Sequence, residues 1–211
     1  MANWQAIIGI VAGLIGLLGF VPYIITAFQG KTRPNRASWW IWGILGVVLG
    51  ISYYCSGASN SIWVPVCFAI SQLVIAIISL RHGEGGWNRL DRMCLLGVGV
   101  SLMMWWLFNS PLAALLFTLL IDFLGALPTI KKSYLEPEQE SWLSWALFLT
   151  ANTLNLLALE NWQLALSAYP FYLFCLSGTI TFLLVQPKLS VLRIKYKRRR
   201  RIGRLKLNHY K

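Results

Sequence analysis

The stretch PNRASWWIW at residues 34–42 decides the fold, because it returns as PEQESWLSW at residues 137–145, which is 103 positions later. The proline, the serine and two tryptophans keep their register in the two copies. Each copy follows an apolar stretch with a proline near its end, GFVPYI at 19–24 and GALPTI at 125–130, and each precedes two more apolar stretches. A block repeated in this way predicts a duplicated structural unit.

The composition indicates a membrane protein. Hydrophobic residues make up 57% of the chain and charged residues 12%, about half the charged fraction of a soluble domain. Apolar runs of about 20 residues are long enough to cross a bilayer as helices. Seven such runs occur, at residues 5–28, 38–55, 61–80, 93–109, 111–130, 141–159 and 162–185. We therefore predict an all-α membrane protein with seven transmembrane helices.

The positive charges provide an independent test of this count. If there are seven spans, successive connections alternate between the two sides of the membrane, and Lys and Arg gather on the cytoplasmic side. All 19 Lys and Arg residues follow the first, third, fifth or seventh run. This pattern predicts an outside N-terminus, a cytoplasmic C-terminus and a plasma-membrane or inner-membrane location. The first run lacks the cationic start of a signal peptide, so we expect it to remain as an anchor.

Two three-helix units can share one orientation only if an odd number of crossings separates them. The run at 93–109 has no counterpart in either copy of the repeat and fits that role. We expect two parallel three-helix bundles joined by a linker helix, with a first bundle at 1–80, a linker containing transmembrane helix 4 at 81–110, a second bundle at 111–187 and a basic cytoplasmic tail at 188–211.

Three helices, a linker helix and three more helices resemble the SWEET sugar-transporter and PQ-loop superfamily over about residues 1–187. Pro22 and Pro128 match the proline that hinges the first helix of each bundle in that family, and Pro170 with Gly178 fits the spacing of its last helix. The resemblance implies alternating access around a solute site near mid-membrane.

The chain departs from the family pattern at several positions. Tyr23 and Thr129 follow the two hinge prolines, where the PQ loop has glutamine, and the second helix of each predicted bundle contains no proline. Val66 and Phe171 stand where SWEET transporters carry a sugar-contacting asparagine. These departures leave the expected fold in place and weaken sugar as the expected solute.

Asp122 is the only acidic residue well inside a predicted span. An ionisable group at that depth is costly and normally faces the bundle interior or a wet cavity, as a solute contact or a proton carrier. The alternative is a protonated aspartate that hydrogen-bonds to a neighbouring helix for packing.

The run at 141–159 carries an unusually polar face. Trp145 and Asn152 are seven residues apart and share one face of a helix, with Asn155 about one turn further on. Amide and indole groups together suit a polar organic solute, whereas hydrogen bonding between helices explains the asparagines equally well. Adding the large polar groups of the two third helices, the predicted solute contacts are Asp122, Asn152, Asn155, Trp145, Gln72 and Tyr172.

The repeated phrase also contributes tryptophans and charges. We expect indoles at the start of a span to anchor it in the headgroup layer, which applies to Trp39, Trp40, Trp42 and Trp142. The first copy is basic where the second is acidic, so the two loops can pair across a pseudo-two-fold axis. This predicts a cytoplasmic gate made of Arg33, Arg36, Glu136, Glu138 and Glu140.

The remaining features assign few partners besides the bilayer and a small polar solute. Eleven cations and no acid lie in 188–211, which is typical of a segment that anchors topology and attracts anionic lipid. Nucleic acid is not favoured, because no nucleic-acid-binding module accompanies this tail. Scattered cysteines without C-x-x-C spacing indicate neither a metal site nor a disulfide framework, so we expect no cofactor. The sequence is compatible with a homo-oligomer.

The sequence fits two functions. The first is a SWEET-like or PQ-loop-like carrier of a sugar or amino-acid-like solute, proton-coupled through Asp122 in one form, with Pro22 and Pro128 as hinges. The second is a receptor, scaffold or assembly protein of the same fold that acts through its tail. An enzyme is not expected, because His82 and His209 lie outside the runs and no catalytic grouping appears.

Overall fold

A computed structural model describes residues 4–55, 63–85, 88–107, 111–159, 162 and 167–186. Within these residues the chain forms α-helices and one short 3-10 helix, without a strand. They are α1 (Trp4–Phe28), α2 (Arg36–Cys55), α3 (Trp63–His82), α4 (Arg89–Leu107), α5 (Pro111–Leu135), η1 (Pro137–Gln139), α6 (Trp142–Leu157) and a seventh helix, Ser167–Gln186. The predicted all-α class is confirmed. The predicted tail at 188–211 lies outside the described residues.

Two of the helices are long and apolar enough to cross a membrane: Ile7–Phe28 within α1, and the seventh helix. The stretch Cys67–His82 of α3 is apolar over a shorter length. Some helices extend beyond the apolar runs, since α4 begins at Arg89 and α5 ends at Leu135. Arg and Lys are good helix formers, so hydropathy marks the apolar part of a helix and not its ends.

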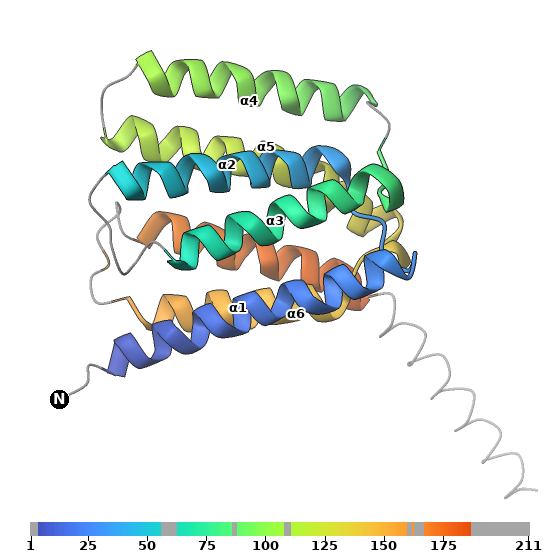
Figure 1. The fold of residues 1–211 in the computed structure, drawn as a ribbon, viewed down its shortest axis with the longest axis horizontal. Helices are drawn as coiled ribbons and strands as arrows, with labels where there is room; N and C mark the ends of the chain where they lie inside the picture. The colour runs from blue at the N-terminus through green and yellow to red at the C-terminus, as the bar shows by residue number, and fades with distance from the viewer. Residues whose placement is uncertain are drawn as a thin grey trace, which may run out of the picture.

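The helices lie side by side, and successive helices run in opposite directions (Figure 1). α1 packs on α6 and α3, α2 packs on α3 and α5, and α4 packs mainly on α5 at one edge of the group. The repeat in the sequence relates α1 to α5 and α2 to α6. The α1–α6 and α2–α5 contacts are therefore equivalent, as in two units that face each other across a pseudo-two-fold axis.

Gly19 of α1 and Gly125 of α5 make these two contacts close. Each lies three residues before the proline of its helix. A side chain on Gly19 would begin 2.5 Å from the ring of Phe148 in α6, and one on Gly125 would begin 2.8 Å from Ile41 in α2. Glycine at both positions lets the neighbouring helix approach, which explains part of the repeated sequence pattern.

The connections that follow α1, α3 and α5 meet at one end of the molecule. Asn35 and Glu84 form an isolated parallel bridge between the first two connections. The Arg33 N–H donates to the Gln139 carbonyl over 2.9 Å, which joins the first connection to the third. The eight Lys and Arg residues that precede position 188 lie in these connections or in the adjoining helix ends. Positive charge in the described residues is thus concentrated at this end.

Candidate functional site

A cavity of about 400 Å³ lies between two helix pairs, α1 with α6 and α2 with α5. The sequence repeat makes these two pairs equivalent to each other. Its walls also include residues of α3 and of the seventh helix, and they combine glycines, aromatic rings and a few polar side chains. Cavities of this volume hold small organic molecules. It is the candidate binding site.

Five aromatic residues form a closed circuit of ring contacts on the cavity wall, and we call them the aromatic cluster: Phe20 from α1, Trp39 and Trp42 from α2, and Trp145 and Phe148 from α6. Neighbouring ring centroids are 5.0 to 6.4 Å apart. Trp42 and Trp145 occupy the same place in the two copies of the repeated phrase, and their rings meet edge to face at 6.1 Å. The last tryptophan of each copy of the phrase therefore lies at the cavity, in contact with its counterpart.

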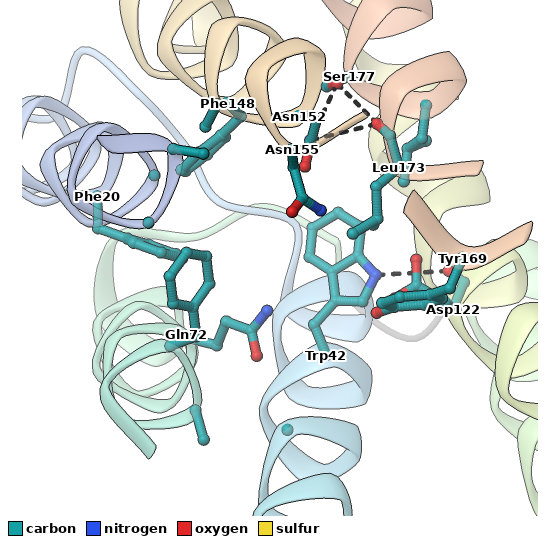
Figure 2. A pocket seen from close by; sticks show the side chains of 18 of the residues that line it. Phe20, Trp42, Gln72, Asp122, Phe148, Asn152, Asn155, Tyr169, Leu173 and Ser177 are labelled. Atoms are coloured by element: carbon teal, nitrogen blue, oxygen red, sulfur yellow. Dashed lines mark hydrogen bonds between the residues drawn. The ribbon is translucent and has the colours of Figure 1, made fainter. Parts of the chain in front are cut away.

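Asp122 of α5 lines the cavity and is 5% exposed. Its carboxylate accepts a hydrogen bond from the Tyr172 hydroxyl at 2.8 Å and a longer one from Tyr169 at 3.3 Å, both from the seventh helix. Figure 2 shows Tyr169 next to Asp122. The indole N–H of Trp42 donates to the Asp122 main-chain carbonyl at 3.4 Å. Among the described residues that line the cavity there is no Lys, Arg or His. Asp122 is thus a buried acid held by neutral donors.

The three amide side chains of the cavity differ in their surroundings. Asn152 donates to the Leu173 carbonyl at 3.3 Å and to the Ser177 hydroxyl at 3.2 Å, which ties α6 to the seventh helix. Gln72 and Asn155 also line the cavity. Figure 2 shows their amides on the other side of the Trp42 indole from Asp122. Asn152 is therefore hydrogen-bonded within the protein, while the amides of Gln72 and Asn155 lie at the cavity wall.

The structure brings together residues that the sequence spreads over four helices. Tyr172 holds the Asp122 carboxylate and is not itself part of the cavity wall. Tyr169 was not predicted, although it lies three residues before Tyr172 and lines the cavity. The other five predicted solute contacts line the cavity: Asp122, Asn152, Asn155, Trp145 and Gln72.

The expectation that Trp39 and Trp42 anchor their helix at a membrane boundary is wrong. Their side chains are 2% and 6% exposed, and both line the cavity, whereas Trp142 is 46% exposed. Hydropathy gives a position along a helix but does not tell which face a tryptophan occupies. The repeat contained the missing signal, because Trp42 is the counterpart of Trp145, a predicted solute contact.

A buried polar group lies next to the aromatic cluster, at the end where the connections meet. The Tyr23 hydroxyl accepts from Trp39 Nε1 at 3.1 Å and donates to Glu140 Oε1 at 2.9 Å. Trp145 Nε1 donates to Glu140 Oε2 at 3.1 Å. Lys132 forms an ion pair with Glu140, and the two side chains are 2% and 0% exposed. We call Tyr23, Lys132 and Glu140 the polar plug, because they are buried at this end behind two tryptophans of the cavity wall.

The residue after each helix proline forms a hydrogen bond to another helix or connection at this end. Tyr23 follows Pro22 and donates to Glu140, two residues before the start of α6. Thr129 follows Pro128, and its hydroxyl donates to that of Ser38 in α2 at 2.8 Å. Each first helix is thereby tied to the start of the second helix of the other repeat.

The gate predicted from charge alone consisted of Arg33, Arg36, Glu136, Glu138 and Glu140. Its predicted pairing is wrong. Arg36 donates to the main-chain carbonyls of Ser79 in α3 and of Gly83 and Gly85 in the connection that follows it. Glu140 pairs with Lys132, while Glu136 and Glu138 are exposed. The turn of η1 brings Glu140 back onto α5, and this approach cannot be deduced from the repeat.

Glu84 is another acid near the plug. Burial raises the pKa of its carboxyl above the ordinary value, the charges of Glu136 and Glu140 add to this increase, and the charge of Lys132 opposes it. Lys132 therefore counteracts the increase in the pKa of Glu84 that burial and the neighbouring acids cause.

Within the described ranges, no three His, Cys, Asp or Glu side chains come together as metal ligands. No known protein family, curated protein or solved structure matches the chain.

Proposed function

We propose that the chain is a seven-span membrane carrier of the SWEET and PQ-loop type, which moves a small polar organic solute by alternating access through the cavity. The observation that carries this proposal is the position of the cavity, between helices that the sequence repeat makes equivalent. Carriers built from such repeats bind their solute between the repeats and move one repeat against the other.

The outer faces of the helices support membrane insertion. Ile10, Leu14 and Leu18 of α1 recur every four residues and are 57% to 65% exposed. A stripe of this kind suits lipid. The concentration of Lys and Arg at the end with the polar plug supports a cytoplasmic position for that end. The cavity is then closed toward the cytoplasm.

Opening toward the cytoplasm requires the polar plug to separate. Pro22 and Pro128 lie inside continuous helices, and each leaves the carbonyl four residues earlier without its helical donor. Bending there would draw Tyr23 away from Glu140 and Thr129 away from Ser38. The two prolines are thus placed to act as hinges directly beside the contacts that must break.

Asp122 gives the carrier a charge that has to be balanced. A carboxylate buried in a membrane protein without a cation nearby is costly, and either a proton or a positive group of the solute would neutralise it. Asp122 would in this way couple solute occupancy to the conformational change.

A pair of glycine substitutions tests whether the cavity is the transport site. A side chain on Gly13 of α1, which lines the cavity, would have no atom within 4 Å, and the same is true of Gly99 of α4. Gly13→Val should narrow the cavity, so we expect it to reduce uptake strongly, while Gly99→Val should leave uptake unchanged. The assay is uptake of labelled glucose, phenylalanine and benzyltrimethylammonium by proteoliposomes containing the full chain. Saturable uptake that Gly13→Val does not reduce, or no uptake of any probe, contradicts the proposal.

A further inference from the structure

We infer that the solute is an organic cation with an aromatic or apolar body, whose positive group lies between Asp122 and the faces of the aromatic cluster. This inference rests on the proposed function in one respect, since it takes the cavity to be the solute site. It is carried by three features of the cavity: one acid without a counter-charge, indoles without a free donor, and a scarcity of groups that bind anions.

The first feature is the isolated charge. Asp122 is the acidic residue among the described residues of the cavity wall, and none of them is cationic. Two phenol hydroxyls donate to its carboxylate, but they bring no positive charge. A solute with one positive group would supply the missing counter-charge and be held by an ion pair shielded from water.

The second feature is that the indoles have no free donor. All three indole N–H groups of the aromatic cluster are used within the protein: Trp39 donates to Tyr23, Trp42 to the Asp122 carbonyl and Trp145 to Glu140. The indoles can therefore offer a solute their π faces and not their donors. The face of an indole attracts cations and apolar rings, whereas a sugar needs many donors and acceptors.

The hydrogen bond from Trp42 to Asp122 also joins the two kinds of attraction. It holds the indole edge against the main chain of the acid, so that carboxylate and π surface lie on the same stretch of wall. A compact ammonium group can contact both at once. Beyond the indole, the amides of Gln72 and Asn155 are placed to bind a polar substituent on the solute body.

The third feature excludes the common alternatives. An anion would meet Asp122 without a compensating cation. A zwitterionic amino acid would place its carboxylate against a cavity wall in which amide side chains are the remaining hydrogen-bond donors. One of these amides, that of Asn152, already donates to groups within the protein. A monocation avoids both costs.

Calorimetric binding to the full chain in lipid nanodiscs tests the inference, with benzyltrimethylammonium as the cationic probe, phenylalanine as the zwitterion and glucose as the neutral polar probe. We expect binding of the cation alone, and a loss of affinity of about tenfold or more in Asp122→Asn, the size of one charge-assisted contact. Asp122→Glu should recover most of the affinity, because it restores the charge. Glu84→Gln, which neutralises an acid outside the cavity, should bind like the wild type.

The outcomes separate this inference from the proposed function. Equal affinity of Asp122→Asn, or absence of cation binding, overturns the inference. If glucose or phenylalanine is transported while the cation does not bind, the carrier stands and its solute class is wrong. If the cation binds through Asp122 but no flux of it occurs in proteoliposomes, the binding site stands and the carrier function falls.

Discussion

Glu140 shows at the scale of a single residue how this chain buries charge. Its side chain is 0% exposed, and both oxygens are satisfied, Oε1 by Tyr23 and Lys132, and Oε2 by Trp145 and the Ser141 N–H. A buried ion pair is a poor source of stability, because desolvation offsets the attraction. Its partners depend on each other strongly, since the loss of one leaves the other charged and unpaired.

This dependence leads to a stability prediction. Glu140→Gln should destabilise the protein by about 3 to 5 kcal/mol, because Lys132 would remain buried without its counter-charge. The double change Glu140→Gln with Lys132→Met should recover much of that loss, since it removes the stranded cation. Chemical unfolding in mixed micelles measures both. If Glu140→Gln alone is as stable as the wild type, water already reaches the ion pair of Lys132 and Glu140.

At the scale of elements, the two equivalent helix contacts depend on glycine. Gly19 faces the ring of Phe148, whereas Gly13, two turns earlier in the same helix, faces open space. Alanine is favoured over glycine in a helix by about 1 kcal/mol. The same substitution should therefore have opposite effects at the two positions.

We expect Gly13→Ala to be neutral or stabilising, and Gly19→Ala to destabilise by about 1 to 3 kcal/mol through overpacking. The ring of Phe148 cannot move freely, because it is also in contact with Phe20 and Trp145. Shortening it in Gly19→Ala with Phe148→Leu should restore part of the stability, as read from thermal unfolding in detergent. If the two alanine variants unfold alike, the α1–α6 contact is looser than described.

At the scale of the whole molecule, the repeat predicted more than hydropathy did. Hydropathy located the helices, but it missed charged helix ends such as Arg89 and assigned Trp39 and Trp42 to the wrong surroundings. The repeat alone implied that Trp42 resembles Trp145. The ion pair of Lys132 with Glu140 could not be foreseen, because it depends on how η1 folds the loop against α5. Side-chain partners of this kind are set by packing, which periodicity does not encode.

The number of membrane crossings remains the decisive property of the whole molecule, and two positions can measure it. If seven helices cross, Lys31 follows the first crossing and Trp162 follows the sixth, so they lie on opposite sides. If only the two helices that are long and apolar enough do so, both positions lie between those crossings and share one side. Lys31 is exposed and Trp162 is 64% exposed, so a cysteine at either position should react.

We expect a membrane-impermeant maleimide, applied to intact cells, to label Trp162→Cys and not Lys31→Cys in a chain whose four native cysteines are replaced. Glu138→Cys, in the exposed loop after α5, should behave like Lys31→Cys, because an even number of crossings separates them. Permeabilised cells should give labelling at all three positions and so control for reactivity. Equal labelling of residues 31 and 162 in intact cells would contradict seven crossings. The proposed carrier function would then be wrong, whereas the description of the cavity and of Asp122 would be unaffected. The reverse pattern, with Lys31→Cys labelled from outside, would keep the seven crossings and place the polar plug at the outer mouth.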